Sequence, residues 1–261
     1  MAASTDARLL RVAGALLVVL ALAGAPSAAA DPNALWSIVD GQCVPHQLDN
    51  DDPAPCARVD LHGGYAVLKD IVGATQFLLI PTARVGGIES PQILAPDAPN
   101  YFADAWRARS FVEQRAGRAM PREWLSLAIN SAAARSQDQL HIHIDCVRAD
   151  VRQALAAHVG DIGPTWAPVP VALAGQRYQA MAVWDPELNS HKPFRLLADS
   201  LSAGDDMGAH TLVVVGSTAP DGRDGFVVLA GRADTARPGS GHGEDLQDHG
   251  ACPPAAEAIG R

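Results

Sequence analysis

The sequence predicts an α+β protein built mainly on an antiparallel sheet with flanking helices. Short runs rich in Val, Ile, Leu and aromatic residues recur along the chain between turns that contain Gly or Pro, which is typical of strands. Longer stretches with a helical spacing of apolar residues occur at residues 100–116 and 150–159. Of the 261 residues, 48% are hydrophobic and 19% are charged, so the chain can form one large or two modest domains and is unlike a disordered protein.

Residues 1–30 differ in composition from the rest of the chain. Arg8 and Arg11 precede an uncharged apolar run, residues 12–25, and small residues follow Pro26, which is the order of an export signal with an Ala-x-Ala cleavage site. The uncharged stretch up to residue 30 is also just long enough for a retained membrane anchor, and both alternatives stay open. Since the basic residues keep the N-terminal end in the cytoplasm, we expect the body on the exported side of the cell (inner) membrane either way.

Residues 31–160 are expected to form a first half in which helices flank a sheet. In chain order we expect a short helix over 34–39, a disulfide-closed loop over 43–56, strands over 64–70 and 76–80, a helix over 100–116, strands over 124–129 and 140–147, and a helix over 150–159. The polar residues 130–138 form the loop between the third and fourth of these strands. Pro81 ends the second strand.

Residues 161–261 are expected to form a second, strand-rich half of the same catalytic unit. The Gly- and Pro-rich residues 160–170 mark the boundary. Strand-like runs follow at 177–184, 194–198, 210–216 and 225–230, with a weak helical stretch at 201–207. The half repeats the general character of the first without a second His-x-His pair, which is compatible with a degenerate internal copy.

Four cysteines fit an exported protein with two disulfides. Cys43 and Cys56 bracket a polar segment with little means of packing itself, so we pair them with each other. Cys146 and Cys252 then form the second bridge, which would tie the C-terminal tail to the end of the strand over 140–147. The alternative for Cys146 is a buried free thiol.

The charge balance restricts the binding partners. There are 29 acidic and 20 basic residues, a net charge of -9, which argues against nucleic acid as a partner. A phosphate site must therefore be built from a few local cations and backbone N–H groups. The tail, residues 241–249, is dense in groups that bind or titrate, although a solvated surface explains such a run equally well.

The segment Gln-Leu-His-Ile-His-Ile-Asp, residues 139–145, is the most informative part of the chain. Alternate side chains of a strand share a face, so Leu140, Ile142 and Ile144 are expected to pack inward while His141 and His143 lie side by side on a polar face. Imidazole suits nucleophilic attack, acid/base catalysis or metal ligation near neutral pH, although a solvated strand face is the plain alternative.

A strand of alternating His after a polar loop resembles the histidine-triad superfamily of nucleotidyl hydrolases and transferases. Gln139 stands at the first His position of that motif, His141 at the middle and His143 at the third. The resemblance implies a histidine-triad-like fold and a middle His that attacks the α-phosphorus of a nucleotide. Gln139 departs from the pattern, and because an amide cannot carry a proton charge, proton delivery to the leaving phosphate is in question.

Seven segments between residues 34 and 252 resemble the bacterial CDP-diacylglycerol pyrophosphatase family. They are Ala-Leu-Trp at 34–36, Cys-Val-Pro at 43–45, Pro-Ala-Pro-Cys at 53–56, Gly-Tyr-Ala-Val-Leu-Lys-Asp at 64–70, Gly-Ile-Glu-Ser-Pro at 87–91, Leu-Ala-Ile-Asn-Ser at 127–131 and His-Ile-His-Ile at 141–144. The resemblance implies an exported, membrane-associated enzyme that needs no cofactor and hydrolyses CDP-diacylglycerol to CMP and phosphatidate.

The expected site follows from this chemistry. His141 is the nucleophile that becomes cytidylylated, and His143 contacts phosphate oxygens or helps the leaving group depart. The candidate substrate-binding residues are polar side chains near the strand and three cations, each also explicable as a surface residue: Gln139, Asn130, Ser131, Ser136, Gln137, Lys69, Arg84 and Arg148. No metal ligand is assigned.

Two other functions stay open. The series His141, His143 and Asp145 could begin a zinc site that activates water, with His210, His242 or His249 as distant ligands. A non-catalytic exported binding protein that retains the fold is the other alternative, motivated by Gln139. The expected partners are CDP-diacylglycerol or another nucleoside diphosphate compound, together with membrane lipid.

Overall fold

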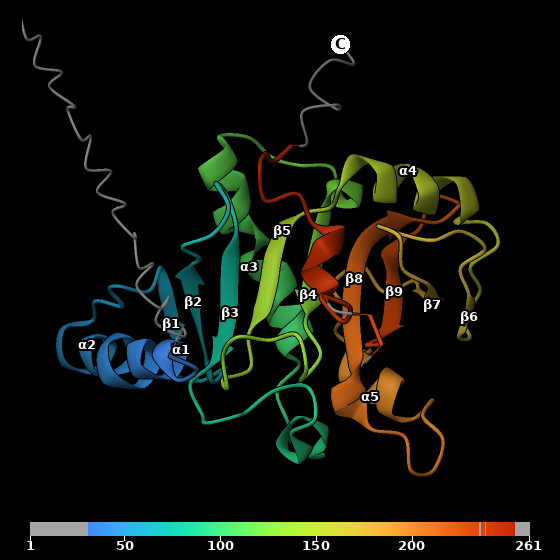
Figure 1. The fold of residues 1–261 in the computed structure, drawn as a ribbon. Helices are drawn as coiled ribbons and strands as arrows, with labels where there is room; N and C mark the ends of the chain where they lie inside the picture. Colours follow the sequence, from blue (N-terminus) through green and yellow to red (C-terminus); the bar gives the residue numbers. More distant parts are fainter. Residues whose placement is uncertain (1–30, 235, 238, 254–261) are drawn as a thin grey trace, which may run out of the picture.

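The structure is a computed structural model that describes residues 31–234, 236–237 and 239–253 (Figure 1). One sheet runs through it with the strand order β1-β2-β3-β5-β4-β8-β9-β7-β6, and neighbouring strands are antiparallel. The predicted α+β class with a large antiparallel sheet is therefore confirmed. The predicted leader, residues 1–30, lies outside the described residues. Within the part that is described, no helix is long and apolar enough to cross a membrane.

The elements of the first half follow the predicted order closely. They are α1 (Ala34–Ile38), α2 (Val44–Asn50), β1 (Arg58–Asp60), β2 (Tyr65–Lys69), β3 (Phe77–Pro81), α3 (Tyr101–Ala116), β4 (Leu125–Ile129), β5 (Ile142–Cys146) and α4 (Ala149–His158). The second half adds β6 (Ala167–Pro168), β7 (Tyr178–Val183), α5 (Pro193–Ala198), β8 (His210–Thr218) and β9 (Asp224–Arg232). Short 3₁₀ turns include Met207–Ala209 and Gly243–Leu246.

Three expected elements are wrong. Residues 194–198 are helical, not a strand, because Pro193 in the first turn supplies a helical φ and the buried Phe194 and Leu197, three residues apart, share a face. Residues 201–206 form turns and irregular structure instead of a weak helix, and Met207 begins the short 3₁₀ turn Met207–Ala209. The disulfide-closed loop begins with α2, because the π-helical turn Val39–Cys43 continues α1 into α2 without a break.

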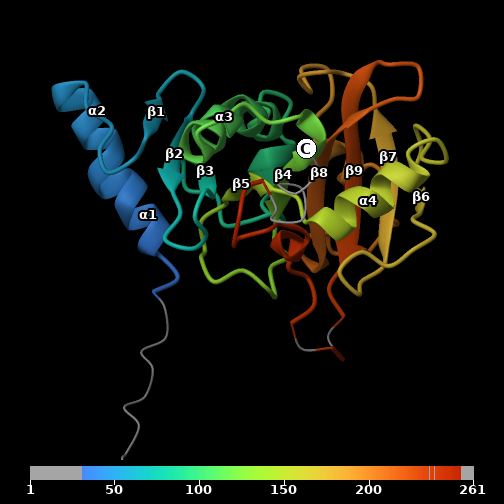
Figure 2. The same cartoon turned by 90° about the horizontal axis from the view of Figure 1, so that it is seen from above.

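Helices cover both faces of the sheet (Figures 1 and 2). On one face, α3 buries Phe102, Trp106 and Val112 against apolar side chains of the central strands. On the opposite face, α1 and α2 pack on β2 and β3, while α4 packs on β7, β8 and β9. The middle of that second face, over β5 and β4, lies between these helical layers and faces the 3₁₀ turn Gly243–Leu246.

The side chains of β5 alternate as predicted. Ile142, Ile144 and Cys146 join the core on the α3 side. His143 consequently lies on the opposite face, in the space between the two helical layers. Polar residues thus occupy the part of the sheet that no helix covers with apolar side chains.

The two halves share the sheet through the pairing of β4 with β8. Each half contains a strand, a helix and then two antiparallel strands, and the first of these strands pairs with the last. In the first half the order is β3-α3-β4-β5, and β3 pairs with β5. In the second half the order is β7-α5-β8-β9, and β7 pairs with β9. Where β5 carries histidines, β9 carries Val227 and Leu229, which pack beneath α4. The second half therefore has an apolar cluster at the place where the first half has its polar site.

Both predicted disulfides are present. Cys43 pairs with Cys56 at a Cα–Cα distance of 5.6 Å, and Cys146 pairs with Cys252 at 5.4 Å. The second bridge holds the C-terminal segment at the end of β5, where the Asp248 N–H also donates to the Cys146 carbonyl at 2.9 Å. The free-thiol alternative for Cys146 is wrong.

Candidate active site

A cavity of about 360 Å³ lies between α1, the turn from β2 to β3 and the C-terminal segment. Its lining divides by chemistry. The apolar side consists of Ala34, Leu35, Ile38, Leu68, Ile71, Val72 and Leu78. The polar side consists of Lys69, Asp70, Asn130, Ser136, Gln137, His141, His143, His242 and Glu244. Ala134 lies among these polar residues.

His141 is held in the tautomer that a nucleophile needs. Its Nδ1 lies 2.7 Å from the backbone oxygen of Gln139. A carbonyl oxygen only accepts, so Nδ1 carries the proton and Nε2 keeps its lone pair. Burial lowers the pKa of His141 below its ordinary value of 6.5, which keeps the ring neutral at neutral pH.

His143 is oriented by the turn between β2 and β3. Nε2 of Gln76 donates to Asp70 at 3.0 Å and lies 2.5 Å from Nδ1 of His143. Since an amide nitrogen only donates, Nδ1 of His143 accepts and the proton of the neutral ring sits on Nε2, which has no hydrogen-bond partner in the described protein. Burial lowers the pKa of His143, and the rings of His141 and His143 lie 4.9 Å apart.

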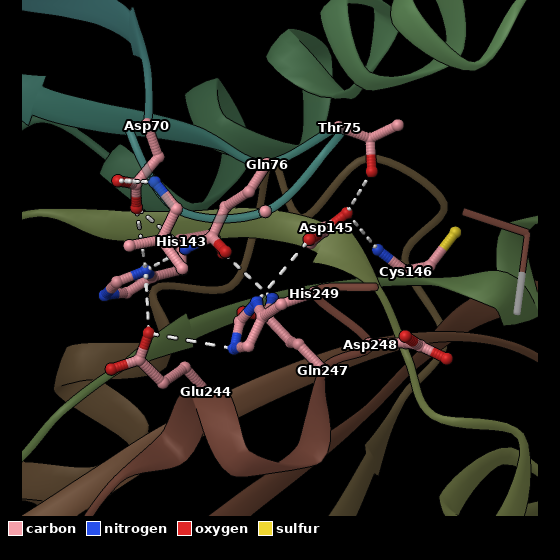
Figure 3. Close-up of polar contacts among 12 residues, drawn as sticks. Asp70, Thr75, Gln76, His143, Asp145, Cys146, Glu244, Gln247, Asp248 and His249 are labelled. Atoms are coloured by element: carbon pink, nitrogen blue, oxygen red, sulfur yellow. Dashed lines mark hydrogen bonds and ion pairs between the residues drawn. The ribbon is translucent and has the colours of Figure 1, made fainter. Parts of the chain in front are cut away.

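The C-terminal segment brings Glu244 to the histidines (Figure 3). Oε2 of Glu244 lies 3.3 Å from Nδ1 of His143, and Oε1 accepts a hydrogen bond from Asn130 at 2.7 Å. The side-chain amide oxygen Oδ1 of Asn130 accepts in turn from the backbone N–H of Gly243 at 2.8 Å. Asn130 therefore fixes the 3₁₀ turn that carries Glu244, and the turn adds a carboxylate to the polar side of the cavity.

A second pair of polar residues closes the site beside β5. Asp145 accepts hydrogen bonds from Thr75 at 2.7 Å and from the Cys146 N–H at 2.9 Å through Oδ1. Its Oδ2 lies 3.7 Å from Nδ1 of His249, and this carboxylate raises the pKa of His249 above 6.5. Nε2 of His249 lies 3.9 Å from Glu244, so His249 connects the two carboxylates (Figure 3).

Comparison with known proteins identifies the family. A sequence profile described as CDP-diacylglycerol pyrophosphatase matches residues 30–256. A CDP-diacylglycerol pyrophosphatase of Yersinia pestis is 45% identical over 218 residues, which cover 83% of this chain and 83% of that protein. The chain belongs to the CDP-diacylglycerol pyrophosphatase family. The matched range includes the histidine strand, both halves of the sheet and the C-terminal segment, so the relationship extends over the whole site.

In this member of the CDP-diacylglycerol pyrophosphatase family, half of the predicted substrate-binding residues line the cavity. Asn130, Ser136, Gln137 and Lys69 do so together with His141 and His143. Gln137 also ties α1 to the histidine loop, since it accepts from the Leu35 N–H at 3.0 Å. Lys69 is the one lysine or arginine in the lining, as far as the described residues go, and donates to the Gly73 carbonyl at 2.9 Å.

The other four predicted residues lie outside the lining of the cavity. Gln139 is fully buried and donates to the carbonyls of Pro81 and Ala83 at 3.0 and 2.9 Å. Ser131 is buried behind the C-terminal segment, where its N–H donates to Gly241. Arg84 contacts Asn33 and the face of Trp36, and Arg148 pairs with Asp150 at the start of α4. Gln139 thus supports His141 through its backbone carbonyl, not through its side chain.

Several site residues in this family member were missed or left undecided by sequence reasoning. Asp70 and Gln76 gave no signal, because nothing in a turn sequence shows which way its polar side chains point. Glu244 and His249 did carry one: the polar density of residues 241–249 and the predicted Cys146–Cys252 bridge together placed that segment beside β5. The solvated-surface alternative for the segment is wrong, since Gly241, Gly243, Leu246 and Gln247 are buried.

The zinc-site alternative requires a cluster of metal-ligating side chains, and the described parts of the chain contain no such cluster. Among these residues there is no group of three or more His, Cys, Asp or Glu side chains arranged to hold a metal ion. Of its proposed distant ligands, His242 and His249 do lie at the site, whereas His210 lines a separate cavity beside Asp205 and Arg232.

Proposed function

We propose that the protein hydrolyses the pyrophosphate bond of CDP-diacylglycerol to CMP and phosphatidate, with His141 as the nucleophile. Family membership supports the reaction. The single observation that supports the residue is the hydrogen bond from His141 Nδ1 to the Gln139 carbonyl, which leaves Nε2 unprotonated at the wall of a cavity that is polar on one side and apolar on the other.

The reaction proceeds in two displacements. Nε2 of His141 attacks the α-phosphorus of the cytidylyl group, and the bond to the bridging oxygen breaks, so that phosphatidate leaves with the electron pair. Water then attacks the same phosphorus, the P–N bond breaks, and CMP is released. The electron pair of the broken P–N bond returns to Nε2, so that His141 regains its neutral form, and the proton of the attacking water is released to solvent.

We assign His143 and Glu244 to positioning and charge around the phosphates. The neutral His143 has an unpartnered Nε2–H that can donate to a phosphate oxygen. Gln76, itself held by Asp70, orients the opposite nitrogen of the ring, and the Glu244 carboxylate lies 3.3 Å from that nitrogen. Lys69 supplies the nearest positive charge on the cavity wall, and Asn130, Ser136 and Gln137 are polar groups within the same wall.

We further propose a histidine-triad-like architecture and a membrane-associated protein on the exported side of the inner membrane. The alternating histidines on a strand of an antiparallel sheet and the repeated strand–helix–hairpin order support the first, including the degenerate second copy. The two disulfides and the leader-like residues 1–30 support the second. The division at residues 160–161 into two halves of one catalytic unit stays a prediction.

The test is hydrolysis by the purified protein of CDP-diacylglycerol in mixed micelles and of a soluble nucleoside diphosphate compound. We expect CMP release from the lipid, loss of turnover in His141→Ala, and an acid-labile cytidylyl group on His141 after rapid quenching, detected by peptide mass spectrometry. His62→Ala, at an exposed histidine away from the cavity, is the matched control and should retain activity.

Each competing function predicts a different result. More than about a tenth of the wild-type rate in His141→Ala would remove it from the nucleophile role, because tenfold is only about 1.4 kcal/mol of barrier. Complete loss of activity on chelation that zinc restores would establish the metal-dependent reaction instead. Binding of CDP-diacylglycerol without any CMP release would leave a non-catalytic binding protein, and hydrolysis of the soluble compound alone would exclude the lipid substrate.

A further inference from the structure

The turn between β2 and β3 presents two apolar side chains to the outside at the rim of the cavity. Ile71 is 101% exposed and Val72 is 54% exposed, and both also line the cavity. Large apolar side chains exposed side by side at the edge of a binding site mark an interaction surface more often than isolated ones do. The apolar wall of the cavity, with Leu35 and Ile38 of α1, continues inward from this rim.

Several polar groups of the same turn are hydrogen-bonded within the protein. Lys69 donates to the carbonyls of Asp70 and Gly73, and Asp70 accepts from the Val72 N–H at 3.0 Å. The Ala74 N–H donates to the His249 carbonyl at 3.3 Å. Because backbone groups without partners are costly in an apolar medium, a turn with this many internal hydrogen bonds can enter such a medium at low cost.

The chain enters the described structure at the other end of the same cavity, beside Gln137, directly after its most apolar segment. Asp31 and Pro32 are the first described residues, and their carbonyls accept hydrogen bonds from Gln137 and from the Asp138 N–H in the histidine loop. The residues that precede them in sequence, 12–30, are uncharged. When a bilayer holds those residues, during export or permanently, the chain leaves the bilayer beside the cavity, next to α1.

We infer that the β2–β3 turn inserts Ile71 and Val72 into the lipid bilayer, and that the apolar wall of the cavity receives the glycerol end of the acyl chains of the substrate. This inference rests on the proposed function, since it assumes a lipid substrate. A cavity of about 360 Å³ is near the lower end of small-molecule sites, so two full acyl chains must leave it. The exposed Ile71 and Val72 mark where they leave.

The same turn then connects the bilayer to the reacting groups. Asp70 precedes Ile71 directly, and its partner Gln76 lies 2.5 Å from His143. A lipid drawn partly from the membrane over Val72 has its pyrophosphate at the polar side of the cavity, beside His141 and Lys69, while its chains stay in an apolar environment throughout. No complete extraction of the lipid into water is required.

The first experiment measures kcat/KM of the full-length protein for CDP-diacylglycerol in phosphatidylcholine–phosphatidylglycerol vesicles and for a short-chain, water-soluble CDP-diacylglycerol. The variant Ile71→Ser/Val72→Ser should lose about tenfold or more on vesicles, because transferring such side chains into an apolar medium is worth at least that factor. Its loss for the soluble substrate should be much smaller, because only the vesicle assay requires insertion of the turn into the bilayer. Leu61→Ser, an exposed apolar residue at the opposite end of β2, is the matched control and should match wild type in both assays.

The second experiment places a tryptophan at position 71 of the full-length protein. The five native tryptophans give a background signal, which is subtracted. On addition of vesicles, the fluorescence of Trp introduced by Ile71→Trp should shift to the blue and be quenched by brominated lipids. The fluorescence introduced by Leu61→Trp should do neither. Equal vesicle activity in Ile71→Ser/Val72→Ser and wild type, or no quenching at position 71, would overturn the inference. A change of oligomeric state in the double variant would show a contact between copies instead. Failure of the wild type to hydrolyse either substrate would refute the proposed function itself.

Discussion

The backbone and the side chain of Gln139 have different roles. The backbone carbonyl orients His141, and the side chain anchors that carbonyl. The Gln139 side chain is a neutral amide with two donors and one acceptor, and it meets two carbonyls and the Val85 N–H in the loop after β3. This anchors the Gln139 carbonyl that orients His141. The departure from histidine at this position is therefore explained by a buried site that needs two donors at once, which neutral imidazole does not offer.

Gln139→Glu tests this account. A carboxylate only accepts, so it would face the carbonyls of Pro81 and Ala83 with no donor, and burial would oppose its charge. We expect the free energy of unfolding to fall by about 1–3 kcal/mol or more and kcat to fall as well. Denaturant unfolding measures the first, with Gln114→Glu at an exposed site of α3 as the control. Equal stability of the two variants would contradict the anchoring role.

The pH dependence of the reaction follows from the neutral His141. In the proposed reaction, attack requires the unprotonated ring, and burial lowers the pKa of His141 below 6.5, so activity should persist as the pH falls through 6.5 and be lost only below it. A profile of kcat/KM between pH 4 and 8 reports the free enzyme and checks this. An acid limb centred at or above 6.5 would mean that the essential base is not a buried histidine.

At the scale of elements, the parts that could be predicted from sequence are those with local causes. The alternation along β5 follows from the geometry of any strand, and the helical spacing of Phe102 and Trp106 predicts α3 from its own residues. Helix α5 could not be predicted, because its short apolar run fits a strand equally well and only burial of Phe194 and Leu197 decides. The placement of Glu244 depends on Asn130, 114 residues earlier, and no local pattern encodes that contact.

Removal of the second disulfide should release the C-terminal segment. Cys146 and Cys252 are 106 residues apart, and closing so long a loop is worth about 4.7 kcal/mol in the chain-entropy model. We expect Cys146→Ser/Cys252→Ser to lose stability on that scale and to lose activity even under conditions where the protein stays folded, because Glu244 is no longer held at His143.

The matched control is Cys43→Ser/Cys56→Ser, which opens a loop of only 13 residues in the first half. That variant should lose less stability and leave the position of Glu244 unchanged. Urea unfolding of both double variants, with CMP release measured at low urea, separates the two effects. Full activity of folded Cys146→Ser/Cys252→Ser would show that the segment docks without its covalent link.

At the scale of the whole molecule, the two halves depend on each other through the centre of the sheet. β4 pairs with β8, so Leu127 lies opposite Val214 and Ala128 lies opposite Val213. Separation at residues 160–161 would expose the apolar edges of β4 and of the longer strand β8, and exposed apolar strand edges are prone to aggregation. For this reason we expect the boundary that Gly and Pro indicate in the sequence to divide one sheet, and not to separate two independent domains.

A fragment of residues 31–160 with Cys146→Ser should therefore not fold as a stable monomer. Circular dichroism and size-exclusion chromatography of the fragment, next to the full chain under the same oxidising conditions, provide the measurement. We expect aggregation or an unfolded spectrum from the fragment. A cooperative thermal transition in a monomeric fragment would show that the first half is a complete domain and that β8 is dispensable for it.

The polar side of the site is assembled from residues far apart in the sequence. His141 and His143 belong to the histidine strand, whereas His242, Glu244 and His249 lie in the segment after β9. The histidine strand can therefore form before its carboxylate partner is in place. We expect the site to be complete only when β8 and β9 have joined the sheet and the C-terminal segment has docked beside β5. A partly folded chain should consequently be inactive, which couples catalytic competence to completion of the fold.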